Sequence, residues 1–551
     1  MRHRERMWAA AVLAAAVILT FYRLGAGTLW DQDETKYAQV AREILQTGDP
    51  ITLHVNGSPW YVHPPLYMWL VAATGRVAGF STFTVRVWSG VASVVAVYAT
   101  MLLGRALFNE RTGVLAGAAL AVTFHFLVQS RLAVFDTVLL AFMLLAAYAA
   151  LRGYQRRRRA DYLWFFVFAG LATLTKGPIG LLLPGLVVAM FVTVRRAWSR
   201  WREVPWVAGL ALYALIGLSW YGGETLLHGA AFVRTVLGYY GVGRFFGVVE
   251  NQAGPWYYYL PILAIGAFPW TAFWPAAAVW HGRRLRDDGS LFVVLWCGAV
   301  AVFYSLARTK LPNYVLPVYP LAAVGVAAMW DRVLDQPPPA SISWLPARLW
   351  LAPQAQGRPA AAWWLTASAV LLAVLVAALD FGIARYLLGL YPQQYREFSR
   401  VLIPPAIALG AGVAVAIALL LSGRRAAAFI SLCAAMALTW LGMITWVVPL
   451  VEAQKPMPVA ARAIAAAWRP GDRILGYRLD IYSSLIYYSG HPVQWLDTPL
   501  ELANDVCLPG RVFIVIAESE RQRVALPKGL TELSAPDGVE VLVKPADLRC
   551  P

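Results

Sequence analysis

The chain has 551 residues, of which 59% are hydrophobic and only 14% are charged, and its formal net charge is +17. With a mean hydropathy of +0.57, this composition excludes an ordinary soluble protein and indicates one that crosses a membrane many times. The positive charge does not indicate nucleic-acid binding, because most basic residues fall in short loops between apolar runs, where the positive-inside rule explains them.

Apolar runs long enough to cross about 30 Å of hydrocarbon predict about thirteen transmembrane helices. The first follows a basic N-terminal segment and is interpreted as a retained signal anchor. One further run, 64–80, is interrupted near its end by Gly75, Arg76 and Gly79 and is interpreted as a helix in the membrane interface. The predicted spans lie near 8–23, 84–104, 112–130, 134–151, 160–175, 178–195, 204–222, 256–280, 290–307, 313–331, 362–381, 403–422 and 426–448.

The distribution of arginine orients these spans. With the N-terminus inside and 64–80 in the interface, the basic clusters, including the four arginines at 156–159, all fall on the cytoplasmic side. The opposite side then receives the polar loop 24–83 and the tail from Pro449. Acidic and basic residues occur together on that side, whereas the cytoplasmic side is almost purely basic.

Three segments are predicted. Residues 1–450 form a transmembrane part, which contains a Pro-rich cytoplasmic linker at 332–360. The tail 451–551 is predicted to form a small α/β domain, because strand-like runs at 473–477, 512–516 and 539–543 follow a helical pattern at 458–468. It shows no catalytic motif and is interpreted as a lid or scaffold. Cys507 and Cys550 lie in this tail and either form a disulfide or remain as two thiols.

The loop 24–83 carries the densest set of ionisable side chains. Asp31 and Asp33, with Glu34 beside them, form a pattern that suits a general base or the oxygen ligands of a divalent metal. The alternative is helix capping, in which Asp31 or Asp33 begins the amphipathic stretch 35–45. For an isolated Asp-x-Asp pattern, capping is the commoner explanation.

Further ionisable residues lie at the predicted membrane edge on the same side. Such residues are costly and usually functional, although snorkelling would explain each one alone. Cations where water is scarce suit a phosphate, and an opposing carboxylate suits a hydroxyl that loses a proton. Together they predict displacement of a lipid phosphate from a sugar. The residues are Arg131, Asp136, Lys176, Arg244, Lys310 and Tyr314.

These residues fall in motifs that resemble those of the GT-C class of polytopic lipid-linked-sugar glycosyltransferases. The resemblance is to the bacterial branch that contains the aminoarabinose (4-amino-4-deoxy-L-arabinose) transferases and protein O-mannosyltransferase-like relatives, and it covers roughly residues 1–450. Single matches are weak, but five in order are strong. They are Asp-Glu-Thr-Lys-Tyr-Ala at 33–38, the Arg131 to Asp136 spacing, Thr-Lys-Gly at 175–177, Arg-Phe at 244–245 and Lys-Leu-Pro-Asn-Tyr at 310–314.

The resemblance implies a GT-C fold in the bacterial inner membrane and transfer of a sugar from an undecaprenyl-phosphate-linked donor to a periplasmic-side acceptor. Lipid A is the expected acceptor, with another envelope glycan or a protein as the alternative. Membrane lipids are further partners, and a monomer is expected. No cofactor is certain, and a divalent metal held by Asp31, Asp33 and Glu34 is left open.

The resemblance also assigns roles to residues. Asp33 is the expected catalytic carboxylate and Asp136 its partner. The expected donor-phosphate residues are Lys176, Arg244, Lys310 and Tyr314. The expected substrate-binding residues are Glu34, Lys36, Tyr37, Trp60, Tyr61, His63 and Arg131.

One departure concerns the end of the loop. Where aminoarabinose transferases tend to show Glu-Lys-Pro, this chain has Val62-His63-Pro64, which puts the identity of the sugar in doubt. His63 either contacts the donor phosphate or the acceptor, or is a structural histidine beside Pro64. Two other classes of function stay open: a transporter or flippase of lipid-linked sugars, although its acids would be expected near the midplane, and an envelope scaffold.

Overall fold

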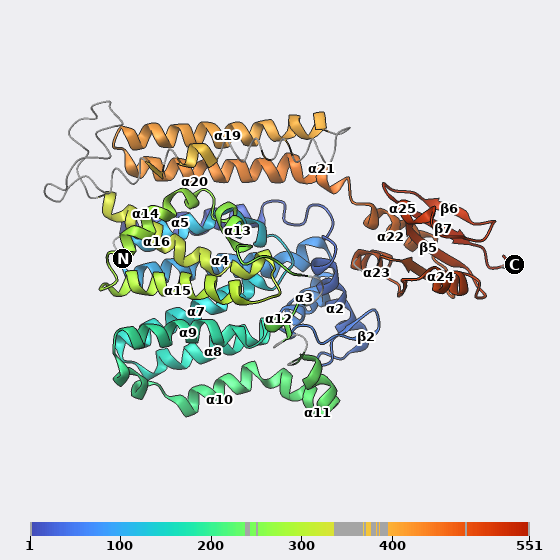
Figure 1. The fold of residues 1–551 in the computed structure, drawn as a ribbon, viewed down its shortest axis with the longest axis horizontal. Coiled ribbons are helices and arrows are strands. Elements are labelled where there is room, and N and C mark those ends of the chain that lie inside the picture. The colour runs from blue at the N-terminus through green and yellow to red at the C-terminus, as the bar shows by residue number, and fades with distance from the viewer. Residues whose placement is uncertain are drawn as a thin grey trace.

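Long helices make up most of the computed structural model, because a backbone in hydrocarbon must satisfy its N–H and C=O groups within its own segment. The structure describes residues 3–236, 243–248, 252–334, 395–479 and 482–548, with 238, 367–368, 371–375, 382 and 385 between them. Figure 1 shows a bundle of helices with a small sheet beyond one end of it. The principal bundle helices are α1 (His3–Phe21), α4 (Thr82–Leu107), α5 (Glu110–Ala121), α6 (Phe124–Gln129), α7 (Asp136–Arg156), α8 (Arg159–Lys176), α9 (Ile179–Val194), α10 (Trp206–Gly217), α11 (Ser219–Val233), α13 (Tyr259–Gly266), α14 (Trp274–Gly282), α15 (Asp288–Leu306), α16 (Val318–Leu334), α19 (Tyr395–Leu421) and α20 (Arg425–Gly442).

Six helical segments in the described residues are long and apolar enough to cross a membrane, or eight if each of two bent pairs is one span. One bent pair joins α10 to the helix that follows it at 57°, and the other joins α13 to 270–282 at 106°. The predicted run 112–130 is divided into α5 and α6, and most of the run 362–381 lies outside the described residues. The structure therefore supports a polytopic helical protein, and the number of thirteen stays a prediction.

The loop 24–83 folds into two helices and a short hairpin. Helix α2 (Asp33–Thr47) begins after Gln32 and ends at Gly48, whose φ of 72° suits a residue without a side chain. Strands β1 (His54–Val55) and β2 (Ser58–Pro59) are joined by Asn56 and Gly57, both with positive φ, as in the common Asn-Gly hairpin turn. Helix α3 (Leu66–Ala78) forms within the predicted interfacial run.

The C-terminal part contains a five-stranded mixed sheet in the order β4-β3-β5-β7-β6. Its strands are β3 (Arg473–Tyr477), β4 (Val493–Leu496), β5 (Val512–Ala517), β6 (Thr531–Ser534) and β7 (Val539–Lys544), and its helices are α22 (Pro456–Ala467), α23 (Ser483–Ser489), α24 (Pro499–Val506) and α25 (Glu518–Arg521). Successive side chains of a strand point to opposite faces. Ile474 accordingly packs with residues of α22 and α23, whereas Leu475 packs with residues of α24. Each face of the sheet is therefore covered by helices.

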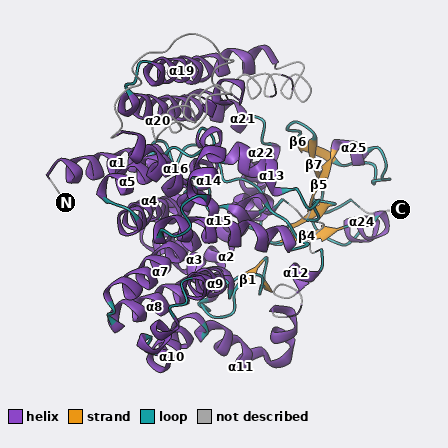
Figure 2. Cartoon of the chain, turned by 60° about the vertical axis from the view of Figure 1, so that its left-hand side comes forward, coloured by secondary structure: helices purple, strands orange, loops and turns teal. Residues whose placement is uncertain are grey.

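The sheet lies beside the loop 24–83, and its strands gather at that end of a chain that is otherwise almost entirely helical (Figure 2). Polar contacts join the two parts. The side-chain amide of Asn56 donates to the Val493 carbonyl at 2.7 Å and accepts from the Val493 N–H at 3.0 Å. The guanidinium of Arg42 donates to the Tyr487 carbonyl at 2.7 Å. Loop and sheet therefore contact each other through both side-chain and main-chain groups.

The cysteines divide into two kinds. Cys507, directly after α24, is disulfide-bonded, whereas Cys297 and Cys433 are free. Cys550, the partner that the sequence suggests, lies outside the described residues. The pairing of Cys507 with Cys550 therefore stays a prediction.

Candidate active site

The centre of the site is a buried ion pair between the ends of two neighbouring helices. Asp136 is the first residue of α7 and Lys176 is the last residue of α8. The Lys176 ammonium donates to one carboxylate oxygen of Asp136 at 2.5 Å, and the amide of Asn313 donates to the other at 2.8 Å. Asp136 is only 4% exposed. Both of its oxygens are satisfied, which is the condition under which a buried carboxylate is tolerated.

Two aromatic rings flank the ammonium of Lys176. The nitrogen lies 5.0 Å from the centre of the Phe135 ring and 4.8 Å from that of Tyr314, within the range of cation–π attraction. The structure thus brings together three of the predicted residues, Asp136, Lys176 and Tyr314. The ammonium has three N–H groups, so it can donate hydrogen bonds beyond the one to Asp136.

Asp33 lies within electrostatic reach of this pair. Its carboxylate accepts a hydrogen bond from the Tyr37 hydroxyl at 3.2 Å. Burial raises the pKa of the Asp33 carboxyl above 3.8, and the charge of Asp136 raises it further, while Lys36, Tyr37 and Lys176 act in the opposite direction. The side chain is accessible to solvent although protein surrounds it at longer range.

The capping alternative for the acidic pattern is wrong in this structure. The N-cap of α2 is Gln32, and its side chain makes no capping hydrogen bond. Asp33 is already inside the helix, and Asp31 accepts from the main-chain N–H of Ser484 at 3.1 Å, far along the chain. The two aspartates therefore have separate partners, and neither caps the helix.

Aromatic side chains form a wall beside Asp33. Tyr37 lies 5.1 Å from Phe135 and 6.1 Å from both Trp60 and His63, measured between ring centres. His63 lies 4.5 Å from Phe135. His63, Tyr37 and Trp60 were all predicted to bind substrate, and the structure brings them together next to the first residue of α2. Tyr37 and Trp60 are only 3% and 8% exposed, so their rings pack mainly on one another, whereas His63 is half-buried.

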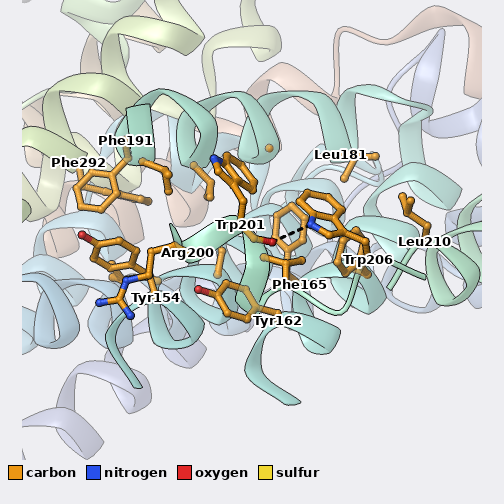
Figure 3. A pocket seen from close by; sticks show the side chains of 17 residues that line it. Tyr154, Tyr162, Phe165, Leu181, Phe191, Arg200, Trp201, Trp206, Leu210 and Phe292 are labelled. Carbon is orange, nitrogen blue, oxygen red and sulfur yellow. Dashed lines mark hydrogen bonds between the residues drawn. The ribbon is translucent and has the colours of Figure 1, made fainter. Parts of the chain in front are cut away.

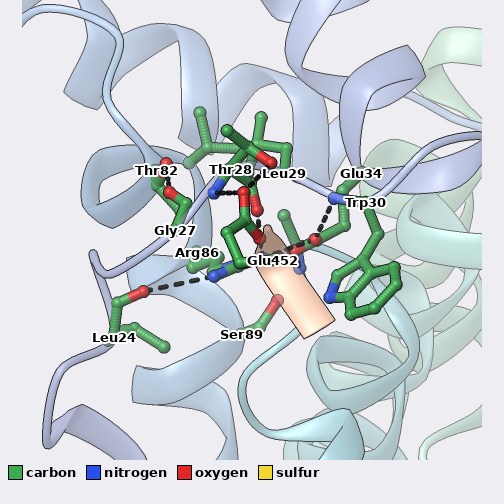
Figure 4. A network of polar contacts seen from close by, with 12 residues as sticks. Leu24, Gly27, Thr28, Leu29, Trp30, Glu34, Thr82, Arg86, Ser89 and Glu452 are labelled. Atoms are coloured by element: carbon green, nitrogen blue, oxygen red, sulfur yellow. Dashed lines mark hydrogen bonds and ion pairs between the residues drawn. The ribbon is translucent and has the colours of Figure 1, made fainter. Parts of the chain in front are cut away.

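Glu34 does not share the role of its neighbour Asp33. Arg86 of α4 binds it through two nitrogens, at 2.8 and 2.7 Å, and the main-chain N–H groups of Trp30 and Ala133 also donate to it. Glu34 is 2% exposed, so no oxygen is left for a substrate. Figure 4 shows this ion pair beside Thr28, which donates through its N–H and its hydroxyl to Glu452. The predicted substrate-binding role of Glu34 is therefore replaced by a structural one.

The same contacts bear on the metal hypothesis. Asp31, Asp33 and Glu34 point to Ser484, Tyr37 and Arg86 respectively. The described part of the chain contains no group of three His, Cys, Asp or Glu side chains suited to a metal ion. Asp33 and Glu34 are successive residues of α2, so their side chains lie about 100° apart around its axis, and Asp31 precedes the helix and points to Ser484.

Other predicted residues are engaged elsewhere. The Lys310 ammonium donates to the carbonyls of Ser305 and Ala307 at 2.8 and 2.7 Å and thereby caps the end of α15. It is 5% exposed, so in this conformation it does not face a phosphate. Arg244 belongs to α12 (Gly243–Phe246), and its side chain lies outside the described residues.

Arg131 and Tyr61 also turn away from Asp33. Arg131 donates to the carbonyl of Thr20 at 2.6 Å, at the end of α1, and burial lowers its pKa to about 10. Tyr61 packs against His228 and Phe232 of α11, at 5.5 and 5.3 Å between ring centres. The structure therefore gives Arg131 a capping role and places Tyr61 on a different wall from Tyr37.

A well-formed apolar cavity of about 180 Å³ lies elsewhere in the bundle. Figure 3 shows it lined by aromatic side chains, with Arg200 near one end and Leu210 at the other. Its residues on α7 are Ala150, Leu151 and Tyr154. At 1.5 Å per residue, these are about 20 Å or more along the helix from Asp136. This cavity is therefore separate from the site of Asp33, Asp136 and Lys176.

Three residues of the site were missed from the sequence. Phe135 contacts Tyr37, His63 and Lys176, and its only signal is that it precedes Asp136. Asn313 lies within the recognised motif at 310–314, where its amide could have been expected to bind an acid. Arg86 lies in an apolar run, and a single arginine within such a run was the available signal for a buried ion pair.

Comparison with known proteins shows which proteins the chain resembles. Residues 62–221 match the family model described as dolichyl-phosphate-mannose-protein mannosyltransferase. The chain is 32% identical over 342 residues to the undecaprenyl phosphate-alpha-4-amino-4-deoxy-L-arabinose arabinosyl transferase of Pseudomonas aeruginosa strain UCBPP-PA14, covering 60% of this chain and 61% of that protein. A relative of the same name from Pseudomonas fluorescens strain Pf-5 is 30% identical over 59% of this chain and 57% of its own length. The chain thus spans about three fifths of the length of the curated relatives that it matches.

The similarity of fold extends further than the similarity of sequence. The crystal structure of ArnT from Cupriavidus metallidurans bound to undecaprenyl phosphate has a TM-score of 0.79 at 20% identity and covers 99% of both chains. The oligosaccharyltransferase of Archaeoglobus fulgidus has a TM-score of 0.53 at 13% identity, over 94% of this chain and 70% of that one. In sequence the chain is therefore similar to the aminoarabinose transferases and, over residues 62–221, to the protein mannosyltransferases, and it shares the fold of ArnT.

Proposed function

We propose that the protein is an integral membrane glycosyltransferase that moves a sugar from an undecaprenyl-phosphate-linked donor to lipid A, on the periplasmic face of the bacterial inner membrane. The observation that carries the proposal is the position of Asp33 opposite the Asp136–Lys176 pair, at the polar end of the bundle. The names of the curated relatives support the donor and the sugar class. The first sugar to test is therefore 4-amino-4-deoxy-L-arabinose.

Lys176 is the proposed residue for the donor phosphate. When the bond between sugar and phosphate breaks, negative charge grows on the phosphate, and an ammonium in a water-poor site stabilises it. Asp136 and Asn313 hold Lys176 in place before the donor binds. Tyr314 lies against the ammonium and offers a hydroxyl as a second donor. Lys310 would join them only after leaving the carbonyls at the end of α15.

Asp33 is proposed to act on the acceptor. A carboxylate with a raised pKa is a better proton acceptor than an ordinary one, and this suits the activation of a sugar or serine hydroxyl. A lipid A phosphate is already ionised near neutral pH, and for that acceptor Asp33 orients the attacking group. The aromatic wall of Tyr37, Trp60 and His63 is proposed to hold the sugar between these two groups.

Two features support the proposed orientation. The basic runs at 156–159 and 195–202 lie at one end of the bundle, and the loop 24–83 with the sheet lies at the other. A disulfide at Cys507 requires an oxidising compartment, as the periplasm is and the cytoplasm is not.

The test is mass spectrometry of lipid A and envelope glycans from cells with and without the gene, together with transfer by the purified protein from undecaprenyl-phosphate-linked sugar. We expect lipid A to gain one pentosamine only when the gene is present and Asp33 is intact. A hexose or uronic acid on lipid A would keep the reaction and change the sugar. Movement of the lipid-linked sugar across vesicles without any transfer would overturn the proposal in favour of a flippase.

A further inference from the structure

The hairpin of α19 and α20 touches the rest of the bundle near its two ends. At one end the Tyr22 hydroxyl hydrogen-bonds with the Thr445 hydroxyl at 3.2 Å, and Phe124 packs against Trp440 at 6.4 Å. At the other end the Arg425 guanidinium donates to the carbonyl of Val333 at 2.5 Å. Figure 1 shows the hairpin lying along the side of the bundle. Phe429 of α20 also stacks on Trp270 at 5.0 Å between ring centres, whereas a groove remains open on the side of α20 that faces α1 and α5.

A groove of about 1060 Å³ lies between α20 and the adjoining faces of α1 and α5. Its depth comes from small side chains, because alanine leaves space that leucine would fill. The walls of all three helices are rich in alanine, including Ala15 of α1, Ala118 of α5 and Ala434 of α20. The lining is apolar along most of its length, as is typical of a surface that faces hydrocarbon.

One end of the groove is strongly basic. Arg4, Arg111, Arg424 and Arg425 line it there, and Glu5 is the acidic side chain among them. Arg111 also pairs with Asp331 of α16. Helices α1, α5 and α20 all begin at this end, so the positive ends of three helix dipoles add to the arginines. Positive charge therefore exceeds negative charge at this end.

We propose that this groove is a binding site for one anionic phospholipid, with the phosphate at the arginine end and an acyl chain along the alanine walls. Charge selects the headgroup, since Arg binds phosphate oxygens through paired N–H groups. The groove is long enough for an acyl chain, because α1 lines it from Arg4 to Leu19, a rise of about 22 Å at 1.5 Å per residue. One leaflet contributes about half of the 30 Å hydrocarbon thickness. The bound lipid joins the α19–α20 hairpin to the bundle.

The proposal is tested on the full-length protein in detergent with phosphatidylglycerol, and with phosphatidylcholine that has the same acyl chains. Native mass spectrometry measures retention of each lipid, and thermal unfolding measures the shift in Tm. We expect wild-type protein to retain phosphatidylglycerol in preference to phosphatidylcholine. We expect the double variant R4Q/R424Q to retain roughly tenfold less, equivalent to about 1.4 kcal/mol of binding. Both side chains are exposed, so the lipid-free Tm should not change.

Two matched variants separate the headgroup from the chain. The variant R158Q/R159Q removes two exposed arginines elsewhere at the basic end and should retain phosphatidylglycerol as wild type does. Ala434→Trp leaves every arginine in place but fills the groove, and should lose the lipid. Equal retention by R4Q/R424Q and wild type, or an equal Tm shift from soluble sn-glycerol 3-phosphate, would overturn the proposal.

The chain also contains a built-in reporter. Cys433 is a free thiol in the lining of the groove, whereas Cys297, the other free thiol, does not line it. Phosphatidylglycerol should slow alkylation of Cys433 by N-ethylmaleimide and leave that of Cys297 unchanged. If Cys433 reacts at the same rate with and without the lipid, or is protected in lipid-free protein, the groove does not hold a phospholipid.

Discussion

The ion pair of Asp136 and Lys176 illustrates why single charges cannot be removed from this site without cost. The side chains are only 5% and 11% exposed. A buried charge that loses its partner keeps its desolvation penalty and gains nothing in return. The pair is therefore a structural element as well as a proposed part of the phosphate site.

For this reason, Lys176→Met should both destabilise and inactivate the protein. The change leaves the Asp136 carboxylate buried, and we expect a loss of about 3 kcal/mol in the free energy of unfolding. The double variant D136N/K176M removes both charges and should recover most of that stability while staying inactive. Thermal unfolding and transfer assays on the same preparations measure the two effects. Recovery of activity in the double variant would contradict the role proposed for Lys176.

Asp33→Asn should have the opposite effect on stability. Burial and Asp136 raise the pKa of Asp33 above 3.8, so ionisation of Asp33 lowers the free energy of unfolding. The loss of stability caused by this carboxyl is absent below pH 3.8, grows as the pH rises from 3.8 to the raised pKa of the folded state, and stays constant above that pKa. The Asn variant should therefore have a higher Tm than wild type at neutral pH and an equal Tm at acidic pH.

The same variant should lose catalysis. Removal of a general base costs about 10²- to 10⁴-fold in rate, and wild-type activity should fall on the acid side at a higher pH than for an ordinary carboxyl. The pH profile of transfer with a hydroxyl acceptor measures this. Full activity in Asp33→Asn would remove Asp33 from the mechanism.

Helix α2 holds Asp33 because it is fixed on two sides. Glu34 ties it to α4 through Arg86, and Asp31 and Arg42 tie the segment to α23, the helix that packs on the sheet. The guanidinium of Arg42 also lies 4.1 Å from the centre of the Tyr487 ring. These contacts make the sheet part of the support of the site.

Arg42→Ala should therefore loosen the sheet from the loop. We expect faster cleavage by protease in the connection at 453–455, and a several-fold lower transfer rate with unchanged thermal stability of the bundle. Arg76→Ala is the matched control, because Arg76 is an exposed arginine of α3 in the same loop. Equal cleavage of the two variants would show that the contact of Arg42 with Tyr487 does not hold the sheet.

The elements differ in how far they can be predicted from sequence. The apolar runs predict long helices because hydrocarbon allows few alternatives, and a short connection between α7 and α8 predicts that the start of one meets the end of the other. The choice between Asp33 and Glu34 could not be predicted. Adjacent residues of a helix point about 100° apart, so a small change in the rotation of α2 would exchange their roles. Only the packing of Arg86 settles it.

Two other residues show a similar ambiguity. Lys310 was predicted to bind the donor phosphate and Arg131 to bind substrate, because both match family motifs and are cations at the edge of the membrane. A helix that ends there also leaves carbonyls without partners, and these two side chains satisfy those carbonyls. From sequence, a cation at this position is compatible with either role.

At the scale of the whole molecule, the two ends differ in charge and in chemistry. The basic loops lie at one end, and α24, which disulfide-bonded Cys507 directly follows, lies at the other. Cys507→Ser should lower the stability of the C-terminal sheet by about 2–4 kcal/mol, the usual effect of removing a native disulfide. Cys297→Ser, which removes a free thiol, should have no such effect.

Peptide mapping without reductant checks the pairing directly. We expect a cross-linked peptide that contains Cys507 and Cys550. Free thiols at both positions in protein isolated from cells would contradict the pairing and would remove one argument for a periplasmic sheet.

The contact between Asp31 and Ser484 joins residues that are 453 positions apart in the chain. At about 5–20 residues per second of synthesis, the ribosome adds Ser484 roughly 20–90 s after Asp31. During that interval the bundle can insert into the membrane, but Asp31, just before α2, lacks its partner Ser484 of α23. We therefore expect unfinished chains to be inserted and inactive, so that the protein acquires its activity only near the end of its own translation.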